Sequence, residues 1–283
     1  MTNDIMTQAM LVGLSLSSCD FKKIDQRASK EAADTHGIDA RKLRATKTLL
    51  PENAPEYVRL KKAVNAVRNE HYRQSLPWTD SGLRIISADQ YFNYTNIMQQ
   101  RINDVENALK DFMQVYSRLQ QEAGLNDLYD PNDYPSVDEL PTRFNCSINI
   151  LPLPIGADFR CSMADPQATE AIRADIDRNT QDAVRTAMTE VLNTLRESVS
   201  KVVTKLSDSE ATFRDSLITN LRELTDEWLP AFNLTKDPNL DAIGREIRSQ
   251  LLADPDTLRS NPTYRQEIAA KAASIVRQME GLY

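Results

Sequence analysis

Basic side chains in the first quarter of the chain are the residues best suited to chemistry with a partner. They form three clusters: Lys22, Lys23, Arg27 and Lys30; Arg41, Lys42, Arg44 and Lys47; and Lys61 and Lys62. Clustered cations of this kind contact phosphates or acidic protein surfaces. Asp20, Asp25, Glu31, Asp34 and Asp39 are interleaved with them, and few aromatic residues are present to stack on bases. The pattern indicates nucleic-acid or acidic-partner contacts, with solvated helix faces as the alternative.

Residues for catalysis or cofactor binding do not form a known pattern. The sequence contains no GxxxxGK[ST], GxGxxG or GxSxG motif. Three cysteines without a CxxC spacing and two histidines do not supply four closely spaced zinc ligands. His71 lies on the apolar stripe of a predicted helix, where we expect a buried, hydrogen-bonded side chain. The sequence therefore predicts no enzyme, no metal site and no cofactor.

The net charge of −7 is unevenly distributed. Residues 1–84 carry a net charge of +4, residues 85–160 carry −6 and residues 161–283 carry −5. Such asymmetry favours a polar partner surface or self-association between unlike parts of two copies. No stretch approaches the roughly 18 apolar residues of a membrane span, and the N-terminus lacks the basic region and cleavage site of a signal peptide. We therefore expect a cytoplasmic homo-oligomer without membrane contacts.

Two long helices dominate the predicted fold. In the first, Tyr91, Met98, Val105, Phe112 and Leu119 recur every seventh residue. The second begins at Asp165-Pro166, with the acid as N-cap and proline in the first turn, and its apolar seam extends to Leu206. Because each helix has one apolar stripe, we expect them to pack as an antiparallel, coiled-coil-like hairpin.

The segment 145–163 between these helices has a β-like pattern. Ser147–Leu151 and 158–162 could pair as two strands, and Pro152 and Pro154 would confine them to a sheet edge. Their predicted partners are short strands at 11–17 and 83–87. Ile148, Ile150 and Phe159 are expected to be buried in this small β element, or alternatively to form an exposed, partner-facing tip. Cys146 and Cys161 are expected to be thiols.

The remaining sequence predicts further helices. One follows Asp20 and ends at Gly37, and an amphipathic helix covers 54–75. Near the C-terminus, helices are predicted to begin at a Ser207/Glu210 capping box, at Asp237-Pro238 and at Asn261-Pro262. They are expected to form a compact bundle or to swap onto a neighbouring protomer. The predicted fold is thus mainly α, with a long helical hairpin, a small β element and a C-terminal helical bundle. We expect three regions: a basic one at 1–84, the hairpin at 85–206 and a helical region at 207–283.

Three segments of the chain resemble a family of uncharacterised proteins from tailed bacteriophages and some bacteria. They are SLPWTDSGLRIISADQYFNY at 75–94, DYPSVDEL at 133–140 and NILPLPIGADFR at 149–160. The similarity covers roughly residues 10–200. It implies a phage-encoded protein in the host cytoplasm, whose gene often lies near those for MoxR-type ATPases. It implies no catalytic residue.

Three hypotheses of function follow. The first is a non-enzymatic, self-assembling phage protein that engages a macromolecular partner such as an ATPase or a host complex. The second is a DNA-binding accessory protein of phage replication or recombination, which would use the basic N-terminal region. The third is an inhibitor of a host anti-phage defence complex. Nucleic-acid titration separates the second hypothesis from the other two.

Overall fold

The computed structural model of this protein is mainly helical and contains a small antiparallel sheet. It describes residues 5, 8–39, 41–78, 82–123, 128–160, 165–208 and 211–282. The chain divides into two compact units. Unit 1 comprises Met1–Gly13, Gln74–Phe92 and Ile150–Tyr283, and unit 2 comprises Leu14–Arg73 and Asn93–Asn149. Each unit combines separate stretches of chain, whereas the expected regions 1–84, 85–206 and 207–283 are consecutive.

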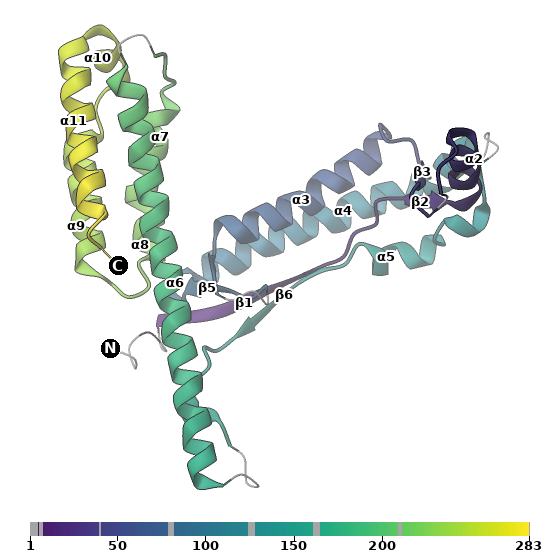
Figure 1. The fold of residues 1–283 in the computed structure, drawn as a ribbon, viewed down its shortest axis with the longest axis horizontal. Coiled ribbons are helices and arrows are strands. Elements are labelled where there is room, and N and C mark those ends of the chain that lie inside the picture. Colours follow the sequence, from purple (N-terminus) through teal and green to yellow (C-terminus); the bar gives the residue numbers. More distant parts are fainter. Residues whose placement is uncertain are drawn as a thin grey trace. The chain divides into compact units, whose positions relative to one another are not determined.

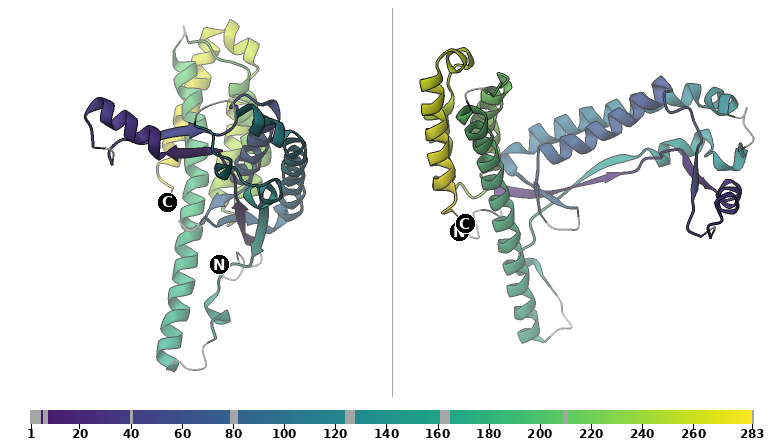
Figure 2. Two further views of the ribbon diagram at one scale, coloured as in Figure 1. Left: turned by 90° about the vertical axis from the view of Figure 1, so that its right-hand side faces the viewer. Right: turned by 45° about the horizontal axis from the view of Figure 1, so that its top comes forward.

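Unit 2 is built on two antiparallel helices, α3 (Pro55–Arg73) and α4 (Tyr91–Ala123), which lie side by side in Figures 1 and 2. Their direction follows from three contacts between them. The Tyr57 and Phe112 rings are 5.6 Å apart, Arg59 forms a 3.0 Å ion pair with Asp111, and His71 Nδ1 lies 2.8 Å from the Tyr94 hydroxyl. The heptad positions of α4 from Tyr94 to Leu119 are buried, as their spacing predicted.

The expected hairpin between the two long helices is replaced by pairings within each unit. The apolar seam of α4 contacts α3, which precedes it in the chain. The second long helix, α6 (Pro166–Ser207), belongs to unit 1, where it packs along α11 (Pro262–Met279). A seam pattern specifies that a helix buries one face, but it does not specify which helix covers that face.

A small α/β module completes unit 2. Strands β2 (Lys22–Asp25) and β3 (Ala45–Thr48) form an antiparallel ribbon in which Ile24 lies opposite Thr46, and α2 (Gln26–His36) follows β2 directly. We call residues 21–48 the α2 module. Phe21 is buried against the rings of Tyr57, Phe112, Tyr116 and Phe144, which anchors the module on the helices. Phe144 is the residue directly after the short helix α5 (Leu140–Arg143).

Unit 1 is a bundle in which α6 and α11 pack with the short helices between them. These are α7 (Ser216–Glu223), a π-helical turn (Leu224–Trp228), α8 (Leu229–Phe232), α9 (Pro238–Leu251) and α10 (Pro255–Ser260). The α6 seam from Val184 to Leu206 shares one core with Leu240, Ile247 and Ile275. The packing confirms that the helices after residue 207 form a compact group.

Side-chain caps begin α6, α9 and α11 where the sequence predicted them, whereas Ser207, the predicted cap of a further helix, is the last residue of α6. Asp165, Asp237 and Asn261 each accept a backbone N–H of the following helix, and a proline occupies the first turn in each case. Asp254 caps α10 in the same way. Because these caps are local in sequence, they can be predicted without knowledge of tertiary contacts.

The four-stranded sheet has the order β4-β5-β1-β6. Its strands are β1 (Ala9–Leu16), β4 (Leu76–Pro77), β5 (Arg84–Ser87) and β6 (Cys146–Leu151), and β1 pairs antiparallel with β5, with Met10 opposite Ile86. The positions of β1, β5 and β6 confirm the predicted strands, and β6 lies at an edge of the sheet, as its flanking prolines require.

The predicted β-hairpin at 145–163 is wrong in its second half. Residues 156–158 form a 3₁₀ turn and residues 159–160 are not in a strand, while Cys161–Met163 lie outside the described residues. Instead, residues 152–160 run along α6 as an extended strap within unit 1. The Gly156 amide donates to Asp177 Oδ1 at 2.8 Å, and the Thr180 hydroxyl donates to the Pro154 carbonyl at 3.0 Å. Leu153 is the buried apolar residue of this strap.

Candidate partner-binding site

All ten predicted basic contact residues lie in unit 2. Five form ion pairs: Lys22 with Glu52, Lys23 with Asp133, Arg27 with Glu31, Arg41 with Asp39, and Lys47 with both Asp25 and Asp133. The other five are Lys30, Lys42, Arg44, Lys61 and Lys62; they are exposed, and none forms a salt bridge with another described residue. The structure therefore separates Lys23 and Lys47, which are held by the nearly buried Asp133, from cations that are exposed in surface ion pairs or without a salt bridge.

Lys47 is the centre of the stabilising ion network. Its Nζ lies 2.7 Å from Asp133 Oδ2 and 3.1 Å from Asp25 Oδ2, and it donates to the Leu128 carbonyl at 2.7 Å. The side chain of Asp133 is only 6% exposed, and Lys23 approaches its other oxygen at 2.5 Å. Hydrogen bonds from Lys23 and Lys47 hold the pKa of Asp133 below its usual value, and the bond to Asp133 raises the pKa of Lys47. This network ties β2 and β3 to the segment after α4.

Asp25 and Ser29 fix α2 against the ribbon. The Asp25 carboxylate caps α2 by accepting the Ala28 amide at 2.9 Å, a bond that, together with Lys47, lowers the pKa of Asp25. The Ser29 hydroxyl donates to the Asp25 carbonyl at 2.5 Å and accepts the Ala45 amide at 2.9 Å. One buried hydroxyl therefore joins the helix to both strands of the ribbon, which gives the α2 module a defined surface.

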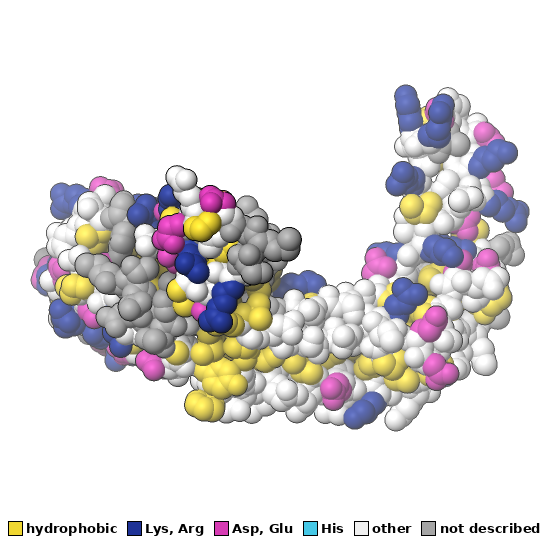
Figure 3. Space-filling model, turned by 90° about the horizontal axis from the view of Figure 1, so that it is seen from below, with side chains coloured by type: hydrophobic (Ala, Val, Ile, Leu, Met, Phe, Trp, Pro, Cys, Tyr) yellow, Lys and Arg dark blue, Asp and Glu magenta, His cyan; other side chains and the backbone are white. Residues whose placement is uncertain are grey.

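That surface contains a groove of about 290 Å³ between α2 and the ribbon. The groove is lined by Ile24, Gln26, Ser29, Lys30, Asp34, Leu43 and Arg44. Ile24 is 47% exposed although it lies on a strand, and Lys30 and Arg44 are two of the cations without a salt bridge. Figure 3 shows Lys and Arg side chains gathered over the part of unit 2 that carries α2 and the ribbon, with acidic side chains between them.

The apolar part of this groove was not identified from the sequence. Ile24 stands alone among charged residues in FKKIDQR, and Leu43 stands among RKLR. A single apolar residue in a charged stretch is a weak signal, because isolated exposed apolar residues are common on protein surfaces. Only the docking of α2 on the ribbon places Ile24 and Leu43 in one groove.

Lys61 and Lys62 lie on α3, outside the groove lining. Lys61 Nζ lies 4.4 Å from the centre of the Tyr57 ring, a cation–π contact that holds its side chain along α3. Lys62 is exposed. These two cations keep their charge at the surface of unit 2, but they belong to a different element from Lys30.

The structure does not bury Ile148, Ile150 and Phe159 together. Ile150 is 36% exposed, and Ile148 and Phe159 are partly exposed. The expectation of a buried cluster is therefore wrong for Ile150, because the second strand that would have covered it is replaced by the strap along α6. Phe159 instead offers its carbonyl to the Arg173 guanidinium, at 3.4 Å from Nε. The alternative of a partner-facing tip stays a prediction.

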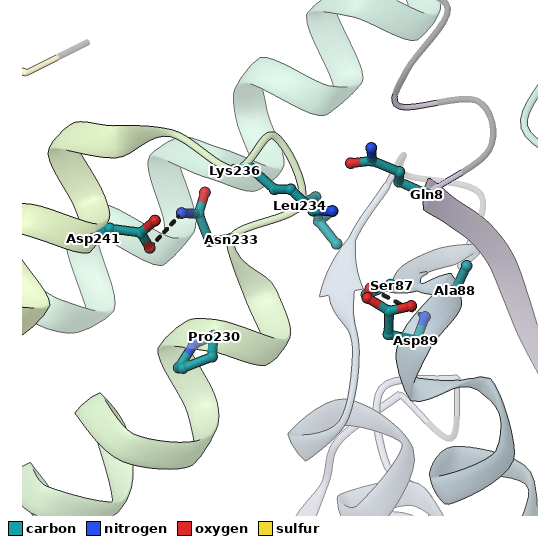
Figure 4. Close-up of a pocket in the computed structure, with 9 residues that line it drawn as sticks. All are labelled: Gln8, Ser87, Ala88, Asp89, Pro230, Asn233, Leu234, Lys236 and Asp241. Atoms are coloured by element: carbon teal, nitrogen blue, oxygen red, sulfur yellow. Dashed lines mark hydrogen bonds between the residues drawn. The ribbon is translucent and has the colours of Figure 1, made fainter.

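A second cavity, of about 280 Å³, lies within unit 1 (Figure 4). Gln8, Asp89 and Lys236 extend toward a common space, and the amide nitrogen of Asn233 donates to Asp241 Oδ1 at 2.9 Å. The charged residues here are exposed and of both signs. This cavity therefore selects no ligand class by its charge.

His71 has the structural role that its position predicted. It is 2% exposed, and its Nδ1 shares a 2.8 Å hydrogen bond with the Tyr94 hydroxyl in the core of unit 2. Cys19 and Cys146 are free thiols, and burial raises the pKa of Cys146 to about 11. The raised pKa keeps the Cys146 thiol protonated at neutral pH. Because the thiolate is the reactive form, this cysteine is unreactive there. Cys161 lies outside the described residues.

No protein-family model, curated protein or solved structure matches this chain. In the described part of the chain, no helix combines the length and apolar character needed to cross a membrane. The same residues contain no group of three or more His, Cys, Asp or Glu placed to hold a metal ion.

Proposed function

We propose that this protein is a non-enzymatic, self-assembling interaction protein that engages a macromolecular partner through the α2 module of unit 2. One observation carries the proposal: Lys30, Lys42 and Arg44 are exposed and form no salt bridge with a described residue, on a module whose other cations are paired. A nearby carboxylate offsets the charge of a paired cation, whereas exposed cations without a salt bridge present uncompensated charge to a partner.

The family resemblance supports a phage origin and a cytoplasmic site of action. The exposed cations of the α2 module, on a chain with a net charge of −7, support self-association between unlike surfaces. An ATPase or a host complex is a partner of the proposed kind. Inhibition of a host defence complex would use the same surface, and it differs from the main proposal only in the identity of the partner.

Charge reversal of the three unpaired cations tests the proposal. The variant combines Lys30→Glu, Lys42→Glu and Arg44→Glu. A matched control reverses three exposed cations of unit 1 that likewise form no salt bridge with a described residue, with Lys201→Glu, Arg222→Glu and Arg245→Glu. Both are compared with the unmodified chain by affinity purification from phage-infected cells, with lysine-reactive cross-linking and mass spectrometry.

We expect the control and the unmodified chain to recover the same partner, with cross-links from Lys30 or Lys42, and the α2-module variant to lose it. Equal recovery by all three proteins would overturn the proposal. Circular dichroism and melting curves establish that each variant is folded, so that loss of the partner is not loss of structure.

Nucleic-acid binding is the second candidate, because the same unpaired cations together with Lys61 and Lys62 could contact phosphates. Each phosphate contact releases counterions, so binding to a duplex should weaken steeply with salt, and removal of a contacting cation should lower that slope. Fluorescence anisotropy with a labelled duplex at about 50 mM salt, where such complexes are strong, is the direct measurement. Absence of binding at that salt concentration removes this candidate.

A further inference from the structure

We infer that the groove between α2 and the β2–β3 ribbon binds an acidic segment of a partner protein that places an apolar side chain between its carboxylates. The inference rests on the proposed function and specifies the chemistry of the partner. The supporting observation is that apolar side chains and cations without a salt bridge line the same preformed groove.

The floor of the groove is apolar. Ile24 projects from β2 and remains 47% exposed, and Leu43 lies on the segment that enters β3. Two apolar side chains held open to solvent at one site favour burial against an apolar group of a partner. The volume of about 290 Å³ lies at the lower limit of small-molecule pockets, which hold roughly 300–1,000 Å³. It therefore suits side chains of a peptide segment better than a cofactor.

The charged lining of the groove selects an acidic segment. Lys30 from α2 and Arg44 from the approach to β3 both line the groove, and neither forms a salt bridge with a described residue. The Arg guanidinium binds a carboxylate through two parallel hydrogen bonds, while the Lys ammonium acts as a compact positive charge. Asp34 is the carboxylate among the lining residues, so the segment is expected to place a backbone N–H or a cation near it.

The same lining disfavours nucleic acid as the occupant of the groove. A single strand would be held by bases stacking on aromatic side chains, and the seven lining residues include none. A phosphate backbone offers no apolar group to contact Ile24 and Leu43. Charge and apolar surface are complementary only to a segment that carries both carboxylates and an apolar side chain.

The groove is formed before a partner binds. Ser29 joins α2 to both strands, and the Lys47 network joins the ribbon to the rest of unit 2. A preformed surface avoids the ordering cost that a mobile segment would incur on binding. Substitution of floor residues that point to solvent should therefore change binding without unfolding the module.

Selection from a random peptide library displayed on a carrier phage, with the full chain as target, tests this inference. Selected peptides are synthesised with a fluorescent label, and their affinities are measured for four proteins: the unmodified chain, Ile24→Ser, the double variant Lys30→Glu/Arg44→Glu, and Ile38→Ser. Ile38 is a matched control, because it is 44% exposed and does not line the groove. Circular dichroism and melting establish that each variant is folded.

We expect the enriched peptides to carry acidic residues around an apolar residue. Their affinity should fall at least tenfold for Ile24→Ser and for the double charge variant, and should be unchanged for Ile38→Ser. The inference is overturned if no peptide is enriched, if the enriched peptides lack acidic residues, or if Ile24→Ser binds them normally.

One further measurement separates this inference from the proposed function. If Ile24→Ser still recovers the cellular partner while charge reversal abolishes recovery, the α2 module binds its partner through charge alone. The proposed function then stands and the groove is not the contact. A labelled duplex that binds and competes with the peptides, with a loss on charge reversal but not in Ile24→Ser, would instead identify a phosphate surface and overturn the inference.

Discussion

At the scale of single residues, the position of a charged side chain in the ion network decides its role. Lys23 and Lys47 looked equivalent to Lys30 and Arg44 in the sequence, but the first two are held by the nearly buried Asp133. An ion pair removed from water is screened less than one at the surface, so its loss should lower the free energy of unfolding. Lys30 and Arg44 are exposed, so their replacement should lower the affinity for a partner rather than the free energy of unfolding.

The Asp133 network should make the stability of unit 2 depend on acid. The pKa of Asp133 is lower in the folded chain than the ordinary value of 3.8. Its contribution is therefore fully present above about pH 4, the carboxyl pKa of the unfolded chain, and is lost as the pH falls through the folded-state value. Asp133→Asn should lower the free energy of unfolding by about 1–2 kcal/mol at pH 7, since its hydrogen bonds are to charged groups. At pH 3, below the unfolded-state pKa, this difference should be smaller than at pH 7.

Urea unfolding followed by circular dichroism at both pH values measures the Asp133 effect. Asp138→Asn is a matched control, because Asp138 is exposed and forms no ion pair with a described residue. An equal cost of Asp133→Asn at pH 7 and pH 3 would contradict the proposed ionic origin of the effect.

Gly156 should tolerate no side chain. A Cβ at this position would meet the Arg173 carbonyl oxygen closer than real Cβ atoms come, with the Arg173 carbonyl carbon at 2.9 Å, and a backbone group cannot move aside as a flexible side chain can. Gly156→Ala should therefore displace the strap from α6 and lower the free energy of unfolding by about 1–3 kcal/mol, the usual cost of overpacking. Gly281→Ala is the control, since its Cβ would have no neighbour nearer than 3.9 Å. Thermal melting that gives the same midpoint for both variants would show that the strap is loosely held.

At the scale of elements, each long helix is stabilised by a partner helix in its own unit. Where α6 ends, the buried Arg265 of α11 donates to the carbonyls of Lys205, Leu206, Asp208 and Ala211, and its guanidinium lies over the Phe213 ring at 5.4 Å. A cation near the C-terminus of a helix is favourable, because the last carbonyls have no intrahelical partner. Arg265 therefore caps the C-terminus of α6 and connects it to α11.

Arg265→Met should therefore destabilise unit 1. The substitution keeps most of the volume of the side chain but leaves buried carbonyls without a donor, at a cost of about 1–3 kcal/mol. Arg265→Lys should recover part of the loss, since one ammonium cannot satisfy all four carbonyls. Tryptophan fluorescence reports unfolding, because Trp78 and Trp228 both lie within unit 1. Equal midpoints for Arg265→Met and the unmodified chain would contradict this role.

The α3–α4 pairing predicts a different response to charges on the α4 seam. Val105 is 2% exposed, and Val105→Asp would bury a carboxylate without a partner, which should cost several kcal/mol. Asn107→Asp, on the exposed face of the same helix, should leave the melting temperature nearly unchanged. Circular dichroism melting of the two variants measures the difference, and a mild effect of Val105→Asp would mean that the seam is not packed in solution.

At the scale of the whole molecule, the unequal charge distribution bears on assembly. The fold combines basic and acidic stretches of sequence in unit 2, but the exposed cations of the α2 module remain attractive to acidic surfaces of a second copy, because the whole chain carries a net charge of −7. Self-association driven in this way should be concentration-dependent and weaken with salt, since exposed charges are screened within about 10 Å at 0.1 M ionic strength. Light scattering coupled to size-exclusion chromatography at low and high salt measures this, and a monomer under all conditions would remove self-assembly from the proposal.

The sequence by itself determined the features that depend on neighbouring residues. The heptad seam of α4, the caps at Asp165, Asp237 and Asn261, the end of α2 at Gly37 and the buried role of His71 all follow from local spacing. Only the tertiary structure decided which helix covers each seam, because an apolar stripe specifies that a face is buried but not which helix buries it. It also decided that residues 152–160 form a strap rather than a strand.

The candidate site shows the same division. The sequence identified every basic residue of the α2 module, but it could not separate paired from unpaired cations, because the partner of Lys23 and Lys47 is Asp133, which is far away in the chain. The groove likewise depends on Ser29 bringing α2 and β3 together, which places Ile24 beside Arg44 across about twenty residues of sequence. Pairing and concavity are properties of distances in space, and these are set only when the elements pack.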